Sequence, residues 1–288
     1  MVSALNPDLS RLLDAADAVV HARGPVTTKG ALRVGVDLGT AYTVLFVVDA
    51  SGLPVAGAYR YAEVVRDGVV LDFAGAVALV RELRAEVEAR IGVDLVTAAV
   101  TIPPGVPITE LRAHRYVVEA AGLECTAVVD EPTAANAVLG LRDGAVVDVG
   151  GGTTGTAVLR GGEVIALADE PTGGTHLSLV IAGHHRIGFD EAEVMKRDPA
   201  NHDRLLPLVR PVLEKIATIV ARHLAGHDVE EIFLVGGTSA FAGIEQVVTS
   251  VTGIRAVVPG NPLFVTPLGI AFHDVPAVLA RSGSGGRP

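Results

Sequence analysis

Residues 145–154 read AVVDVGGGTT: an apolar run ends in Asp148 and passes into three consecutive glycines and two threonines. Residues 34–40 read VGVDLGT and have the same form, with Asp37 before a turn that contains Gly39. The two aspartates lie 111 residues apart, and further strand-like runs and helical periodicity follow each of them. The pattern predicts an α/β protein of two related lobes with a cleft between them.

Both turns have the chemistry of a phosphate site. Glycine gives the backbone access to turn conformations that are closed to other residues, so that successive N–H groups can converge on an anion. The aspartate beside each turn suits Mg²⁺, bound through ordered water. Taken singly, each turn also fits an ordinary hairpin, since Asp and Gly are common turn residues. The candidate phosphate-binding residues are Gly39, Thr40, Ala41, Gly150, Gly151, Gly152 and Thr153, and the candidate Mg²⁺ residues are Asp37 and Asp148.

Two more motifs carry candidate residues. Residues 129–135 read VDEPTAA, in which Pro132 occupies the first turn of a helix and Glu131 can orient an attacking water. Acids at a helix start also stabilise the helix dipole without any chemistry. Residues 234–239 read LVGGTS, a turn that fits a purine or ribose, or a plain strand-to-helix connection. The candidates on the adenosine side are Gly236, Gly237 and Thr238, and those at a ribose or phosphate edge are Gly173 and Gly174.

The composition argues against several classes of protein. Over 288 residues, 23 Lys and Arg against 33 Asp and Glu give a net charge of −10, which disfavours nucleic acid and anionic membranes as partners. The single cysteine, Cys125, excludes an intramolecular disulfide and a cysteine-rich metal site. The longest stretch without Asp, Glu, Lys or Arg, residues 256–273, is interrupted by three prolines, which excludes a membrane-spanning helix there. We therefore expect a cytoplasmic protein.

In this order and spacing, the motifs resemble those of the actin-like ATPase superfamily, which includes DnaK-type chaperones, MreB, FtsA and sugar kinases. The matching stretches are VGVDLGTAYT (34–43), VDEPTAA (129–135), VVDVGGGTTG (146–155), FLVGGTS (233–239) and VTPLGIA (265–271). The resemblance spans residues 32–272. It implies an α/β two-lobe actin-like fold, in which duplicated RNase H-like lobes with reduced subdomains enclose a nucleotide cleft. It also implies ATP or ADP and Mg²⁺ as cofactors and catalytic roles for Asp37, Glu131 and Asp148.

Three further stretches are similar to a narrower family, the DnaK-like accessory proteins of ethanolamine utilization. They are VVRDGVVLDFAGAV (64–77), ADEPTGGTHLSLVIAGHHRI (168–187) and VRPVLEKIATIVARHL (209–224). This resemblance implies an ATP-binding chaperone or assembly factor associated with a bacterial microcompartment. Its partner would be a protein client, such as ethanolamine ammonia-lyase, or a microcompartment component. An actin-, MreB- or FtsA-like scaffold or filament protein stays open as the alternative, and a sugar or acid kinase is a weaker one.

Two departures from the superfamily pattern bear on catalysis. The second phosphate motif ordinarily carries an acid where this chain has Gly155. The chain has only three lysines, Lys29, Lys196 and Lys215, so the DnaK-type catalytic lysine of the first lobe has no counterpart. Arg66 lies in the right region, but its planar guanidinium does not replace a compact ammonium group. Hydrolysis is therefore left open, and at most we expect a weak Mg²⁺-dependent ATPase.

The patterns also predict how the chain is divided. Residues 1–30 form an N-terminal helix and linker, residues 31–143 form lobe I, and residues 144–265 form lobe II. Residues 266–280 return to lobe I. Residues 281–288, RSGSGGRP, have the composition of a disordered tail. The apolar stripe of the N-terminal helix fits either a helix docked on its own domain or a detachable helix that binds a microcompartment shell.

Overall fold

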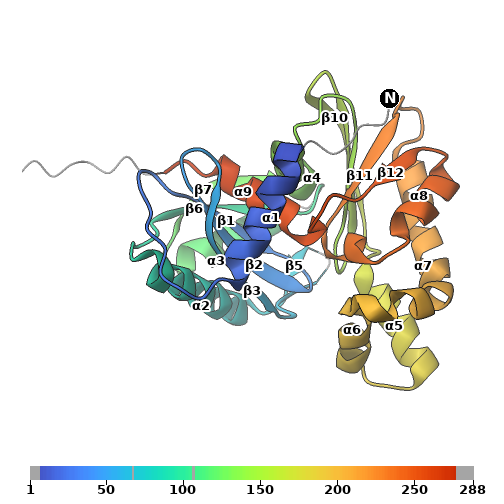
Figure 1. Ribbon diagram of the computed structural model, residues 1–288, viewed down its shortest axis with the longest axis horizontal. Helices are drawn as coiled ribbons and strands as arrows, with labels where there is room; N and C mark the ends of the chain where they lie inside the picture. The colour runs from blue at the N-terminus through green and yellow to red at the C-terminus, as the bar shows by residue number, and fades with distance from the viewer. Residues whose placement is uncertain (1–6, 67, 106–107, 277–288) are drawn as a thin grey trace, which may run out of the picture.

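The computed structural model describes residues 7–66, 68–105 and 108–276 (Figure 1). The strands of lobe I are β1 (Arg33–Leu38), β2 (Tyr42–Val48), β3 (Pro54–Tyr61), β6 (Thr97–Ile102) and β7 (Glu124–Asp130), and its helices are α2 (Phe73–Ile91) and α3 (Ile108–Ala120). The strands of lobe II are β8 (Gly144–Val149), β9 (Thr154–Arg160), β10 (Glu163–Glu170), β11 (Glu231–Val235) and β12 (Arg255–Val257), and its helices are α5 (Gly174–His185), α6 (Phe189–Arg197), α7 (His202–His223) and α8 (Ile244–Thr252). The remaining elements are α1 (Pro7–His21), α4 (Glu131–Leu139), α9 (Val265–His273), the two-residue strands β4 (Val65–Arg66) and β5 (Val69–Val70), and the 3₁₀ helices η1 (Pro199–Asn201), η2 (Gly237–Ala240) and η3 (Pro262–Phe264).

The two large sheets have the same strand order. It is β3-β2-β1-β6-β7 in lobe I and β10-β9-β8-β11-β12 in lobe II. In each sheet the first three strands of the order are antiparallel and the last two run parallel to the central strand. This equivalence confirms the duplicated two-lobe α/β architecture. The predicted tail at 281–288 lies outside the described residues.

Each lobe has its own apolar core, built from one face of its sheet. In lobe I, α2 and α3 cover that face, and Val80, Leu83 and Val87 of α2 are buried there. In lobe II, α5, α7 and α8 contribute to the corresponding core. The central strand β8 is buried along its whole length, which explains why its sequence is a continuous apolar run instead of an alternating one. Strands β1 and β8 both end at the cleft, so Asp37 and Asp148, each one residue before the end of its strand, lie close to the same cavity.

Helices α4 and α9 lie between the two sheets and form a third core. α9 contacts β1 and β2 of lobe I, and α4 contacts β8 and β9 of lobe II. The two helices pack directly against each other at Gly269 of α9, where a side chain would overlap the carbonyl oxygen of Ala134 in α4. There is likewise no room for a side chain at Gly35 of β1, which lies against α9: a methyl group there would be 2.8 Å from the carbonyl oxygen of Pro267. These glycines permit backbone-to-backbone approach between the lobes.

The N-terminal helix α1 is docked on lobe I, next to β3 (Figure 1). Its apolar stripe is buried, with Leu13 and Ala16 fully inaccessible to solvent. The largely buried Arg90 of α2 donates hydrogen bonds to the carbonyl oxygens of Val19 (2.8 Å) and Gly57 (3.1 Å). Of the two alternatives for this stripe, the structure therefore shows the docked helix.

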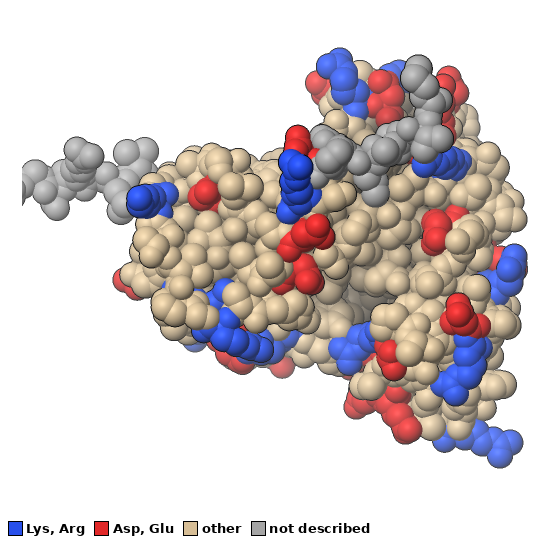
Figure 2. All heavy atoms as spheres, in the orientation of Figure 1, with Lys and Arg blue, Asp and Glu red and all other residues tan. Residues whose placement is uncertain are grey.

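The surface carries its charges in small mixed groups. On the face drawn in Figure 2, Lys and Arg side chains lie close to Asp and Glu side chains, and most of the face is uncharged. Within the described residues, no helix has both the length and the apolar character needed to cross a membrane.

The close crossing of α4 and α9 is tested by adding one methyl group. Alanine in place of glycine stabilises an ordinary helix by about 1 kcal/mol. We expect Gly269→Ala to do the opposite, lowering the free energy of unfolding by about 3 kcal/mol, because the added methyl group separates two backbones. Urea denaturation measures the change.

The matched control is Gly260→Ala, since no atom lies within 4 Å of a side chain at that position. Its unfolding midpoint should equal that of the wild type. A Gly269→Ala midpoint at or above the wild-type value would contradict the proposed packing.

Candidate functional site

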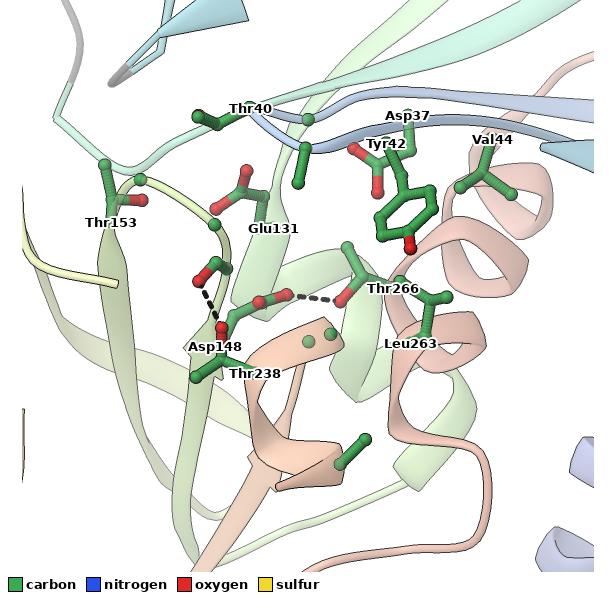
Figure 3. Close-up of a pocket in the computed structure, with 18 of the residues that line it drawn as sticks. Asp37, Thr40, Tyr42, Val44, Glu131, Asp148, Thr153, Thr238, Leu263 and Thr266 are labelled. Atoms are coloured by element: carbon green, nitrogen blue, oxygen red, sulfur yellow. Dashed lines mark hydrogen bonds between the residues drawn. The ribbon is translucent and has the colours of Figure 1, made fainter. Parts of the chain in front are cut away.

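A cavity of about 280 Å³ lies between the lobes, and Figure 3 shows the residues around it. Its wall includes Asp37 at the end of β1, Glu131 at the start of α4 and Asp148 in β8. The three carboxylates thus come from three elements and face one space (Figure 3). The other predicted residues that line the cavity are Gly39, Thr40, Ala41, Gly150, Gly151, Gly152, Thr153, Gly236, Gly237 and Thr238.

The two glycine-rich turns are closed by equivalent hydrogen bonds. In the first turn the N–H of Gly39 donates to the carbonyl oxygen of Tyr42, and in the second the N–H of Gly150 donates to that of Thr153, both at 3.0 Å. The turns also touch across the cleft, because a Cβ atom on Gly151 would lie 3.0 Å from the Cβ atom of Ala41. The duplication therefore places two similar backbone turns face to face.

Gly173 and Gly174 do not line the cavity. They begin α5 directly behind the second turn, where the N–H of Gly174 donates to the carbonyl oxygen of Gly150 at 2.9 Å. A side chain on Gly173 would lie 2.6 Å from the same oxygen. In this structure the pair supports the turn from behind.

Two residues of the adenosine motif, Gly236 and Thr238, pack on the second turn as well. Gly236 has a φ of 85° and lies against the Asp148 carboxylate, which leaves no space for a side chain. Thr238 donates a hydrogen bond from its hydroxyl to the carbonyl oxygen of Gly150 at 2.7 Å (dashed in Figure 3). The position of the turn is thus fixed from two sides.

The three carboxylates of the cleft resist ionisation. Burial raises the pKa of Asp37 to about 7, helped by the charge of Asp148 and opposed by a 2.8 Å hydrogen bond from the Thr101 hydroxyl. Burial raises the pKa of Asp148 to about 6, against a 2.5 Å hydrogen bond from the Thr266 hydroxyl. Burial, followed by the charges of Asp148 and Asp37, raises the pKa of Glu131 well above its usual range. A cation in the cleft would relieve this repulsion.

The donor set fits a hydrated Mg²⁺ ion. Carboxylate oxygens are the hard ligands that Mg²⁺ prefers, and Mg²⁺ ordinarily keeps several of its waters. Among the described residues, no group of three or more His, Cys, Asp or Glu side chains is arranged to hold a metal directly. Asp37 and Asp148 therefore suit a cation held through water and phosphate oxygens.

A polar cluster on α6 also lines the cavity, and the sequence patterns did not identify it. Lys196 donates from Nζ to Oε2 of Glu193 at 2.7 Å and to the carbonyl oxygen of Gly174 at 3.1 Å. Glu193 also accepts a 2.6 Å hydrogen bond from the Ser178 hydroxyl. In the sequence these residues show only as an ion pair at helical spacing, which most exposed helices carry.

Arg197, the next residue of α6, connects the two lobes. Its Nη1 donates to the Tyr42 hydroxyl of lobe I at 2.5 Å. Its guanidinium also lies over the rings of Tyr42 and Tyr61, at 5.8 and 5.4 Å from the ring centroids. This contact closes one side of the cavity.

Arg66 lies outside the inner cavity. It is exposed on β4 and lines a second, outer cavity of about 590 Å³ together with Tyr61 and Glu63. The only lysine in the inner cavity wall, among the described residues, is Lys196, which comes from lobe II. The structure therefore places no lysine of lobe I at the candidate site.

Comparison with known proteins identifies relatives over most of the chain. The family model of the type IV pilus assembly protein PilM matches residues 111–264. The ethanolamine utilization protein EutJ of Salmonella typhimurium is 44% identical over 248 residues, which cover 86% of this chain and 87% of the relative. The crystal structure of EutJ from Carboxydothermus hydrogenoformans matches with a TM-score of 0.88 and 46% identity, and covers 92% of this chain and 98% of that one.

A more distant match shares the fold. The structure of MreB5 of Spiroplasma citri bound to AMPPNP matches with a TM-score of 0.69 and 17% identity, over 84% of this chain and 95% of that one. Both resemblances drawn from the sequence motifs are confirmed by these similarities. The chain shares its fold with MreB, and it belongs to the EutJ family of ethanolamine utilization proteins and, with PilM, to the actin-like ATPase superfamily.

Proposed function

We propose that this protein binds Mg²⁺·ATP between its lobes and acts as a nucleotide-controlled assembly factor in ethanolamine utilization. The observation that carries the proposal is the pair of equivalently hydrogen-bonded turns that meet beside Asp37, Glu131 and Asp148. Backbone N–H groups of such turns bind phosphate oxygens. The AMPPNP in the structure of MreB5, which has the same fold, supports a nucleotide as the ligand.

Each lobe contributes one half of the phosphate site. The turn at Gly39 to Ala41 and the turn at Gly150 to Thr153 would bind the β and γ phosphates from opposite sides. Asp37 and Asp148 would hold hydrated Mg²⁺ beside those phosphates. A bound Mg²⁺ ion supplies positive charge that offsets both the phosphates and the crowded carboxylates. Binding would therefore draw the two lobes together.

The adenosine would lie toward the 3₁₀ helix η2 and helix α6. Glu193 can accept hydrogen bonds from ribose hydroxyls, and Lys196 can donate them. Gly237, Phe241 and Leu263 also line the cavity, and their apolar surface suits a flat base.

We propose that the protein acts through whether nucleotide is bound, and that the rate of ATP hydrolysis matters less. Glu131, at the start of α4, would orient an attacking water, but no lysine of lobe I lies in the cavity wall described by the structure. We therefore propose slow hydrolysis. A ligand that binds the closed arrangement better than the open one shifts the population toward closure, and lobe closure alters a surface that spans both lobes.

The proposed partner is a protein of the ethanolamine pathway, either ethanolamine ammonia-lyase or another microcompartment cargo protein. Membership of the EutJ family supports the pathway, and the resemblance of the motifs to DnaK-type chaperones supports an assembly role. The test is recovery of denatured lyase with the purified protein, with and without ATP. ATP-dependent recovery is expected, with Asp148→Asn as the inactive control.

Unchanged folding, activity and encapsulation of the lyase in all conditions would exclude this client. Filaments seen by electron microscopy only with ATP would favour the scaffold alternative.

Removing the Asp148 charge should weaken binding only when Mg²⁺ is present. We expect Asp148→Asn to raise the Kd for ATP about tenfold or more in Mg²⁺, because a residue that orients the hydrated metal is lost. In EDTA the Kd should stay equal or fall, because one carboxylate no longer repels the phosphates. Isothermal titration calorimetry measures both values.

Asp143→Asn is the matched control, since Asp143 precedes the same strand at its far end, where its carboxylate accepts a hydrogen bond from the N–H of Gly161. An Asp148→Asn protein that binds Mg²⁺·ATP as tightly as the Asp143→Asn control would contradict the site.

The crowded carboxylates also predict how stability depends on pH. Asp37 and Asp148 have pKa values of about 7 and about 6 in the folded protein, against about 3.9 for aspartate in unfolded chains. The folded state therefore binds more protons between about pH 4 and 7, so these two groups make the protein less stable as the pH rises through that range. The substitution Asp148→Asn removes the titrating group of Asp148, and it also removes the negative charge that raises the pKa of Asp37.

We thus expect Asp148→Asn to be more stable than the wild type at pH 8, with a difference that shrinks toward pH 5.5. Thermal unfolding of both proteins without nucleotide measures the difference. A difference that is constant with pH, or that grows toward pH 5.5, is the contrary outcome.

A further inference from the structure

Asp148, Gly155 and Asp169 form a row across three neighbouring strands. Asp148 of β8 lies opposite Gly155 of β9, and Gly155 lies opposite Asp169 of β10. Residues paired across antiparallel strands project from the same face of the sheet. Because Asp148 faces the cleft, Asp169 lies on the cleft face too, two strand spacings or roughly 10 Å along the row.

The middle residue of the row is Gly155, and the carboxylate of Asp169 lies next to the place where a side chain at residue 155 would be. A Cβ atom on Gly155 would lie 3.5 Å from Oδ1 of Asp169 and 3.3 Å from Cδ of Pro104. The φ angle of Gly155 is outside the left-handed region, so its backbone conformation is open to any residue. A Cβ atom at residue 155 would therefore be in ordinary contact with the Asp169 carboxylate, and only the atoms beyond Cβ of an acid there would compete with that carboxylate for space.

Asp169 also acts on the cleft electrostatically. Its charge is one of those that face Glu131, after Asp148 and Asp37 in strength. Glu131 lines the inner cavity, so the field of Asp169 reaches that cavity from β10. A carboxylate in this position can accept a hydrogen bond from a water bound to a cation in the cleft.

We propose that Asp169 is a positioning residue of the Mg²⁺·nucleotide site, supplying from β10 the carboxylate that the second turn lacks at Gly155. Asp169 itself does not line the cavity, so it would act through water, by orienting a water of the hydrated cation on the side of β10. This inference rests on the proposed nucleotide binding and adds a fourth carboxylate to it. It also gives a physical reason for the absence of an acid at residue 155, because the carboxylate of such an acid would crowd that of Asp169.

The first test is the affinity for ATP of Asp169→Asn, measured by calorimetry with Mg²⁺ and with EDTA. The expected result is a Kd raised about tenfold in Mg²⁺, as is typical when an outer carboxylate of a metal site is lost, and an unchanged Kd in EDTA. Glu163→Gln is the control, since Glu163 is exposed at the opposite end of the same strand and should leave both values unchanged.

The second test moves the carboxylate from one strand to the other. Asp169→Ala should weaken Mg²⁺·ATP binding, and adding Gly155→Asp to that variant should restore the Kd to within about threefold of the wild type, because the acid then occupies the same volume from β9. Gly155→Asp alone, with Asp169 still present, should lower the thermal midpoint. A merely structural role of Asp169 would produce neither the Mg²⁺ dependence nor the rescue.

The outcomes separate this inference from the proposed function. A wild-type protein that binds no nucleotide would overturn both. A wild type that binds Mg²⁺·ATP, with an Asp169→Asn variant of equal affinity, would overturn the role of Asp169 alone. A folded double variant that fails to recover affinity would do the same.

Discussion

The contact between Gly269 and the carbonyl group of Ala134 holds the two lobes in register, because it lets α9 and α4 cross with their backbones touching. The same crossing places the candidate site. α4 begins with Glu131 at the cleft, and α9 carries Thr266, whose hydroxyl donates to Asp148 in the other lobe. A change in the way α4 and α9 cross would therefore move Glu131, and it would also move Thr266, which donates the hydrogen bond to Asp148. In this way the packing between the lobes and the geometry of the cleft form a single constraint.

The cleft contains groups that are unfavourable without a ligand. Burial raises the pKa values of all three enclosed carboxylates, and neighbouring carboxylate charges raise those of Asp37 and Glu131 further. The two backbone turns also approach so closely that a side chain at Gly151 would crowd Ala41. Local rules broken in this way are typical of functional sites. Each of these features becomes favourable once a cation and phosphates are present, since the N–H groups bind anions and the carboxylates bind the cation. The proposed nucleotide binding would thus account for features that folding alone would select against.

The sequence predicts those parts of the fold that depend on local chemistry. Glycine and aspartate at the ends of apolar runs predicted both turns, and Pro132 after Asp130 predicted where α4 begins. Contacts between distant segments were not predictable in this way. Thr266 and Asp148 are 118 residues apart, and the Glu193–Lys196 pair is indistinguishable in the sequence from an exposed ion pair. In the sequence, Gly155 was recognisable only as a position where the superfamily ordinarily has an acid. Its pairing with Asp169 depends on the register of β9 and β10, which the sequence does not show. The buried stripe of α1 likewise fitted two placements until its packing was known.

We propose that both turns and the carboxylates of both lobes hold one Mg²⁺·nucleotide, and a crystal structure of the wild-type protein with Mg²⁺ and a non-hydrolysable ATP analogue would locate it. We expect the β and γ phosphates between Gly39 and Gly151, with Mg²⁺ within one water of Asp37 and Asp148. An empty cleft at saturating ligand, or an analogue bound elsewhere on the chain, would contradict it.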